Sequence, residues 1–94
     1  MSDARLLVLA SLCDGPRHGY SIQSDIEAFA TVRLGPGTLY GAINSLERDG
    51  LIDALPTADR RRPYRLTSPG RDHLCARLRE LDRIRARTAA VRLA

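Results

Sequence analysis

Apolar residues recur at helical spacing in three stretches of the first half of the chain. The first stretch predicts a helix capped by Ser2 or Asp3, and an Asp-Gly-Pro turn at residues 14–16 ends it. Its broad apolar face consists of Leu6, Leu7, Leu9, Ala10, Leu12 and Cys13. A second helix is expected to begin at Gly19 or Tyr20. Ile22, Ile26 and Phe29 follow at i, i+4 and i+7, which predicts that they share one buried stripe.

A third helix is predicted to open at Thr38, after a Leu-Gly-Pro-Gly break, and to end at Gly50 as its C′ residue. Its apolar positions are Leu39, Ala42, Ile43 and Leu46. The opposite face carries Thr38, Tyr40, Gly41, Asn44, Ser45 and Arg48. Because that face is polar, with small residues near its N-terminus, we expect it to lie close to another molecule.

The rest of the chain predicts a two-stranded ribbon and one long helix. Residues 51–55 and 63–66 are typical of short strands, and the Arg60, Arg61 and Arg62 triplet stands beside the tip of the turn between them. Ser68 is the expected N-cap of the last helix, with Pro69 at its first position. Nothing then interrupts a helix of about 25 residues, or about 37 Å, up to Ala94. Its apolar stripe is formed by Leu74, Leu78, Leu81, Ile84 and Val91.

This order of elements is that of a winged helix-turn-helix. We therefore expect a mainly α chain with a small β-ribbon (α+β). Residues 1–67 would form the winged helix-turn-helix and residues 68–94 a C-terminal dimerisation helix, together one compact unit. In such proteins the third helix enters the major groove of DNA while the ribbon reaches the flanking backbone.

Charge is distributed unevenly along the 94 residues of the chain. All fifteen basic residues are arginine, and the formal net charge is +4. Up to Leu55 four arginines stand against seven carboxylates, a net of −3, whereas from Pro56 onward eleven stand against four, a net of +7. This asymmetry indicates that the second part meets a polyanion, the alternative being a solvated, arginine-rich helix face.

Double-stranded DNA is the partner that these features predict. On the third helix, the hydroxyls of Thr38 and Tyr40 suit phosphate oxygens, whereas Asn44 suits an adenine and Arg48 a guanine or a phosphate. Gly41 and Ser45 would face DNA beside them. Contacts to the DNA backbone are expected from Arg60, Arg61 and Arg62 in the ribbon and from Tyr20 and Ser21 on the second helix. Arg17 and His18 offer a further backbone contact, although His18 equally fits a turn-stabilising role.

The last helix is too long to be covered by a domain of this size. A homodimer would bury its leucine stripe together with Leu6 and Leu9 of the first helix. Two-fold symmetry would also set two third helices about 34 Å apart, which is one turn of DNA. The alternative is that the last helix packs onto its own domain.

Three segments have a recognisable sequence. They are HGYSI at residues 18–22, PGTLY followed by LERDGLI within residues 36–52, and RPYRLT at residues 62–67 with Gly70 just after. In this order and spacing they resemble the PadR family of bacterial regulators. The resemblance implies a repressor that binds an inverted-repeat operator, dimerises through its first and last helices, and in many members is released by a small hydrophobic or phenolic effector. With a single helix after the ribbon, the chain is similar to the short form of the family.

Other functions find less support in the sequence. Cys13 and Cys75 are expected to be buried thiols, and with His18 and His73 they lack the tight spacing of a metal site, so no metal or other cofactor is expected. Two alternatives remain: a metal- or redox-responsive repressor, and a winged-helix module that binds protein instead of DNA. No catalytic motif is present, so an enzyme is not expected. The longest apolar run is too short for a membrane span or a signal peptide, which predicts a cytoplasmic protein.

Overall fold

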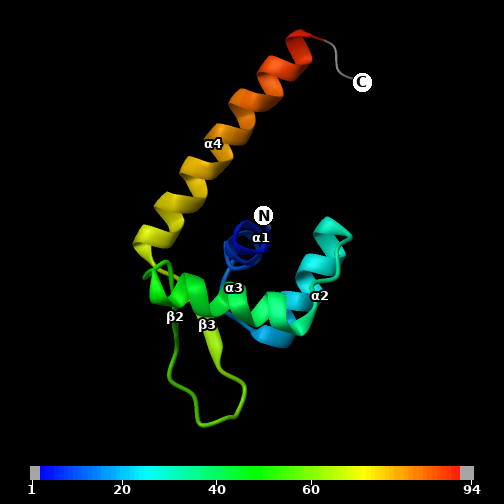
Figure 1. Ribbon diagram of the computed structural model, residues 1–94. Coiled ribbons are helices and arrows are strands. Elements are labelled where there is room, and N and C mark those ends of the chain that lie inside the picture. The colour runs from blue at the N-terminus through cyan, green and yellow to red at the C-terminus, as the bar shows by residue number, and fades with distance from the viewer. Residues whose placement is uncertain (1–2, 92–94) are drawn as a thin grey trace.

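A computed structural model describes residues 3–91 and confirms a mainly helical chain with a small sheet. Three helices come first, α1 (Ala4–Ser11), α2 (Gly19–Ala30) and α3 (Pro36–Arg48), and the short strand β1 (Arg17–His18) directly precedes α2. The strands β2 (Ile52–Ala54) and β3 (Pro63–Leu66) follow, and then α4 (Ser68–Ala90). In Figure 1, α4 leaves the body as a long arm, and the β2–β3 loop, which we call the wing, projects the opposite way.

Within the described residues the sheet has three strands, not the two that the sequence predicts. The order is β1-β3-β2, and both pairings are antiparallel. Arg17 stands opposite Tyr64 in the first pairing, and Ala54 stands opposite the same Tyr64 in the second. A strand of two residues is too short to show an alternating pattern, so β1 could not be predicted. Its consequence is that β3, the strand that follows the wing, is hydrogen-bonded to the segment that directly precedes α2.

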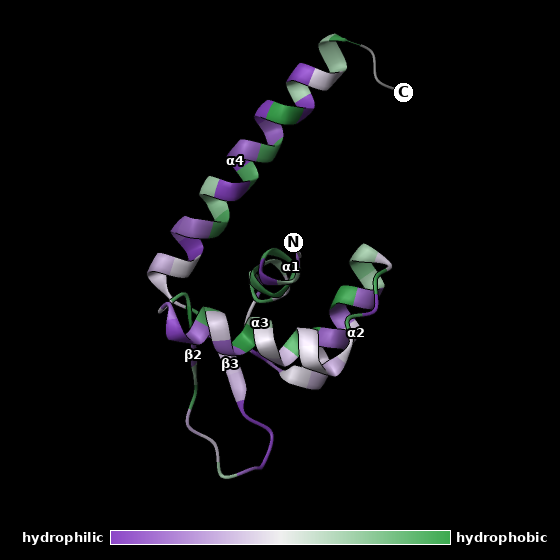
Figure 2. Ribbon diagram, in the orientation of Figure 1, coloured by the Kyte–Doolittle hydropathy of each residue, from purple (hydrophilic) through white to green (hydrophobic). Residues whose placement is uncertain are grey.

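The core lies where the first three helices meet. Leu9 of α1, Ile22 and Ile26 of α2, and Ile43 and Leu46 of α3 are each at most 1% exposed. Figure 2 shows α1 as predominantly hydrophobic inside this arrangement, whereas hydrophilic and hydrophobic residues alternate along the free part of α4. The amphipathic patterns of the three helices therefore specify the body of the fold.

Two expectations about burial were wrong. Phe29, placed by its spacing on the buried stripe of α2, is 50% exposed because it lies in the last turn of that helix, beyond the core. Cys13 and Cys75 are both exposed, not buried thiols. The physical reason for Cys13 is that α1 ends at Ser11, so Cys13 lies in the turn that follows. Cys75 follows buried Leu74 on α4 and points to solvent.

Several helix boundaries also differ from those expected. α3 opens at Pro36, two residues before Thr38, since proline is favoured in the first turn and Gly35 serves as the N-cap. Thr67, not Ser68, caps α4, and its Oγ accepts a hydrogen bond from the N–H of Gly70 at 3.0 Å. Gly50 has a φ of +75°, as expected for a C′ residue. The predicted end of the last helix at residues 92–94 lies outside the described residues.

The start of α4 is fastened to the turn between α3 and β2. The N–H of Thr67 donates to the carbonyl of Leu51 at 3.1 Å, and its Oγ donates to the carbonyl of Gly50 at 2.7 Å. Gly70 lies against the same turn, where a Cβ would overlap the carbonyl oxygen of Leu51. The backbone of Leu51 therefore leaves no room for a side chain at position 70.

None of the helices within residues 3–91 combines the length and the hydrophobicity that a membrane span requires.

Candidate nucleic-acid interface

The polar face of α3 divides into two environments. Thr38, Gly41 and Ser45 line a shallow depression of about 310 Å³ with Ala4 and Arg5 of α1. On the outward side, Asn44 and Arg48 are exposed, and neither side chain forms a hydrogen bond or an ion pair with any residue between 3 and 91. The six predicted contact residues therefore do not act alike. Asn44 and Arg48 are free to reach another molecule, whereas Ser45 is engaged by α1.

A cleft of about 280 Å³ lies between α3, the N-terminus of α2 and the wing. It is lined by His18, Gly19, Tyr20, Tyr40, Arg60, Arg61, Arg62 and Tyr64. Phenol hydroxyls and guanidinium groups, both donors to phosphate oxygens, thus come from three separate elements to one place. The structure brings together the predicted residues Tyr20, Tyr40 and the arginine triplet, and it adds Gly19 and Tyr64, which the sequence did not suggest.

Tyr40 is fixed in this cleft by a close approach to Gly19. A Cβ at position 19 would overlap the Tyr40 hydroxyl and lie 2.9 Å from Cζ, so only glycine leaves the phenol ring room. Gly19 itself is buried, while Tyr40 is 47% exposed. The absence of a side chain at the start of α2 therefore determines where a half-exposed ring of α3 lies.

This contact predicts the effect of Gly19→Ala. We expect the Tyr40 ring to swing out of the cleft, lowering DNA affinity about fivefold while the thermal midpoint changes by only a few degrees, because the displaced atoms end a flexible side chain. Fluorescence anisotropy with labelled duplex and thermal unfolding measure the two effects. Tyr40→Ala should give a similar loss, and the double variant should lose no more than either single variant. Additive losses would show that Gly19 acts independently of Tyr40.

His18 stabilises the start of α2. Its Nδ1 accepts a hydrogen bond from the N–H of Ser21 at 3.3 Å, which makes it the N-cap, and its ring stacks on Tyr20 with centroids 6.5 Å apart. These contacts favour the turn-stabilising alternative for His18. They also hold exposed Tyr20 at the edge of the cleft.

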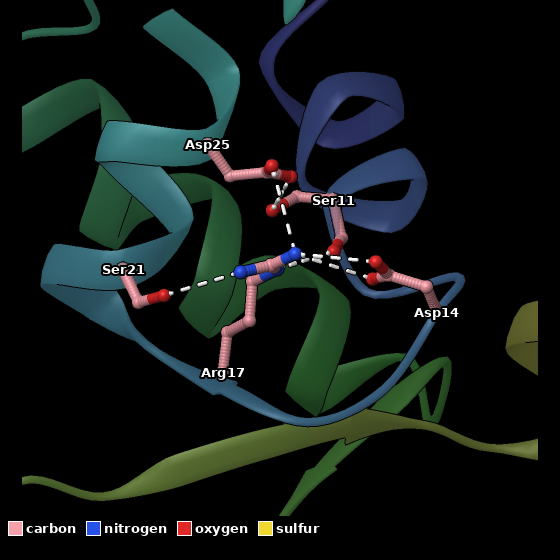
Figure 3. Close-up of polar contacts among 5 residues, drawn as sticks. All are labelled: Ser11, Asp14, Arg17, Ser21 and Asp25. Carbon is pink, nitrogen blue, oxygen red and sulfur yellow. Dashed lines mark hydrogen bonds and ion pairs between the residues drawn. The ribbon is translucent and has the colours of Figure 1, made fainter. Parts of the chain in front are cut away.

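Arg17 is engaged within the chain (Figure 3). Its Nε donates to the carbonyl of Ser11 at 2.9 Å, and its terminal nitrogens reach Asp14 at 3.3 Å and Asp25 at 3.6 Å. Ser11 Oγ donates to Asp25 at 2.8 Å, and Arg17 also reaches Ser21 Oγ at 3.4 Å. Arg17 therefore connects the end of α1 with β1 and α2, and it is not a free cation at the cleft.

The wing arginines differ from Arg65 in having no internal partner. Arg65 of β3 donates to Asp53 of β2 at 2.9 Å, and this hydrogen bond raises the pKa of the Arg65 guanidinium. The side chains of Arg60, Arg61 and Arg62 are exposed and form no ion pair with any residue that the structure describes. Among the described residues they therefore present three uncompensated charges in the wing, the loop that projects away from α4 in Figure 1.

The predicted dimerisation residues fall into two groups. Leu9 and Leu74 are buried within the chain itself, and Leu6 and Leu81 are half-buried. Leu78, Ile84 and Val91 are exposed by 46%, 57% and 55%. The apolar surface that α4 leaves uncovered therefore lies along its distal part.

The described residues contain no cluster of three or more histidine, cysteine or acidic side chains that could hold a metal ion. Besides Gly19 and Tyr64, the structure adds Arg5 as a functional candidate that the sequence does not indicate. Arg5 of α1 contacts Ser45 and Asp49 at the C-terminal end of α3. No periodicity indicates such a contact, because its partners are forty or more residues away and depend on how α1 crosses α3.

These features define a winged helix-turn-helix of the kind found in transcriptional regulators. The model of the Transcriptional regulator PadR-like family matches residues 8–76, and the chain belongs to this family. The family resemblance of the three sequence segments is thereby confirmed.

Solved structures agree with this fold. A PadR family transcription regulator from hypervirulent Clostridium difficile R20291 is 23% identical, with a TM-score of 0.87 over 96% of this chain and 98% of that one. A transcriptional regulator from Clostridium thermocellum is also 23% identical, with a TM-score of 0.84 over 97% and 91%. An uncharacterised 37.1 kDa protein in transposon Tn4556 of Streptomyces fradiae is 44% identical over 86 residues, which are 92% of this chain and 25% of that protein. The chain thus spans about a quarter of the length of this curated relative.

Proposed function

We propose that this chain is a homodimeric, sequence-specific DNA-binding regulator that represses transcription from an inverted-repeat operator. The observation that carries the proposal is the cleft where α3, the start of α2 and the wing meet, lined by three arginines that pair with no residue from 3 to 91. α3 is then the recognition helix. The phosphates of a DNA backbone are bound by cationic and hydroxyl groups, and here such groups lie along one edge of the recognition helix.

The roles of individual residues follow from their surroundings. Asn44 and Arg48 are exposed, have no partner within the described part of the chain, and would read base edges, Asn44 an adenine and Arg48 a guanine. Tyr20, Tyr40 and the wing arginines would hold the backbone beside the half-site. Thr38 stands in the first turn of α3 and would meet a phosphate at the groove edge.

The exposed part of the α4 stripe supports the dimer. Ile84 lies in the distal part of α4, Val91 is the C-cap of that helix, and both side chains are exposed. A second copy would cover these side chains and give the two-fold symmetry that an inverted repeat requires.

An effector would need the dimer as well. The groove between α1 and α4 has a volume of about 130 Å³, well below the roughly 300 Å³ of a small-molecule pocket. Leu6 and Leu9 give it an apolar wall beside Arg77. A small hydrophobic effector would therefore bind where a second copy deepens this groove.

The proposal is tested by binding to a duplex from the protein's own upstream region, titrated with salt against random DNA of equal length, followed by selection from random sequences. We expect a preferred, inverted-repeat sequence and two chains per site. Selection that enriches no sequence would contradict the proposal and favour a protein-binding module.

The dimer surface has its own prediction. Ile84→Asp should raise the dimer dissociation constant about 100-fold, because a carboxylate would be buried in an apolar contact. Sedimentation equilibrium measures the constant, and operator binding should weaken in parallel. Ala86→Asp adds the same charge on another face of α4 and is the matched control. Equal dimer dissociation constants for the two variants would show that the distal stripe is not part of the interface.

A further inference from the structure

We propose that Arg5 is a positioning residue for the recognition helix: it fixes α3 to α1 and thereby sets the orientation in which Asn44 and Arg48 meet DNA. The inference rests on the proposed function, since it concerns the helix that would read the operator. It also assigns Ser45 a role inside the protein, as the anchor for Arg5, instead of the contact to DNA that the sequence predicts.

The contact joins the two helices at two points. Arg5 lies in the first turn of α1, and one of its terminal nitrogens donates to Oγ of Ser45 while the other pairs with Asp49 at 3.0 Å. Ser45 and Asp49 are one helical turn apart, so a single guanidinium spans the last turn of α3. Because the planar guanidinium is held at two points, it fixes the orientation of α3 relative to α1 as well as the distance between them. A single point charge would fix only the distance.

The same contact changes the charge that α3 presents. Glu47 and Asp49 flank Arg48, and Asp49 is half exposed. A free carboxylate at this end of the helix would repel the phosphate backbone. The pairing with Arg5 partly offsets the charge of Asp49, and Arg48, which has no partner among residues 3–91, is left as the cation that is available to DNA.

Arg5 also connects the recognition helix with the proposed dimer surface. Its side chain lines the groove between α1 and α4 beside Leu6, His73 and Arg77, and it lines the depression along the Thr38 side of α3. Arg5 thus stands on α1, contacts the helix that would read a half-site, and lines a groove whose other wall is α4. A change in the α1–α4 groove would reach α3 through Arg5.

The test separates position from charge with two substitutions in the full-length protein. Arg5→Gln removes the charge, whereas Arg5→Lys keeps it but cannot hold Ser45 and Asp49 with one rigid fork. The readout is the ratio of affinities for the selected operator and for random DNA, measured by anisotropy over a salt series. We expect both variants to lower this ratio about fivefold, while Arg5→Lys binds random DNA with wild-type affinity and salt dependence.

A second comparison asks whether Ser45 acts through Arg5. Ser45→Ala alone should lower the ratio, but added to Arg5→Lys it should lower it no further. Additive loss would show that Ser45 contacts DNA itself and would overturn the inference, as would an unchanged ratio in both Arg5 variants. Thermal midpoints within a few degrees of wild type show that each variant is folded. If the wild-type protein prefers no sequence, the proposed function fails, and this outcome is distinguishable from a wild-type preference that Arg5 does not affect.

Discussion

Replacing Gly70 with alanine should lower the free energy of unfolding by about 3 kcal/mol, even though alanine is the better helix former. The added methyl group would overlap the backbone carbonyl of Leu51, which is itself held by the N–H of Thr67. Because neither backbone group can turn aside like a flexible side chain, α4 must move away from the α3–β2 turn. The thermal midpoint should fall by about 15 °C for a chain of this size.

Urea unfolding measures this effect, and Gly41→Ala is the matched control. Gly41 also lies inside a helix, but nothing within 4 Å would meet a Cβ there. That variant should be more stable than wild type by roughly 0.5–1 kcal/mol. A Gly70→Ala variant that also gains stability would show that α4 is not seated against Leu51.

Removing the three wing arginines together, as Arg60→Ala, Arg61→Ala and Arg62→Ala, should lower both the affinity for DNA and the salt dependence of binding. Each phosphate contact that is lost should reduce the slope of log K against log salt by about 0.9, and affinity at about 0.1 M salt should fall at least about tenfold. The loss should be similar for operator and random DNA, because phosphate contacts carry no sequence information. A salt titration of both duplexes measures it.

The control removes the same charge from another part of the molecule. Arg79, Arg83 and Arg87 are exposed, lie on one face of α4, and form no ion pair with any residue from 3 to 91. Their triple alanine variant should leave the salt slope close to that of wild type. A matching drop in both variants would mean that net charge, and not the wing, determines the salt dependence.

The helices could be predicted because each carries enough turns for its apolar period to be visible. Ile22 and Ile26, or Ile43 and Leu46, are buried as their spacing indicates. Phe29 shows where this reasoning fails. Periodicity gives the direction in which a side chain points, but it does not reveal whether another element extends far enough to cover it.

The sequence predicts which polar residues belong to the candidate site, but it does not predict which residues of the chain they contact. Asn44 and Ser45 are neighbours in the sequence and both polar, yet Ser45 is bonded to Arg5 whereas Asn44 has no partner among the residues that the structure describes. Gly19 and Tyr40 likewise meet only after α2 and α3 have packed. Contacts between distant segments depend on crossing geometry, which local composition does not encode.

The pairing of β1 with β3 has a consequence for the DNA sequences that this protein would recognise. Because His18 pairs with Pro63, the base of the wing is hydrogen-bonded to the strand that directly precedes α2, and we expect the wing to keep its position relative to α2 and α3 on the duplex. Each half-site would therefore have a fixed length, and inserting one base pair between the bases that α3 reads and the phosphates that the wing holds would abolish recognition. Among natural operators, variation in length should be confined to the spacer between the two half-sites.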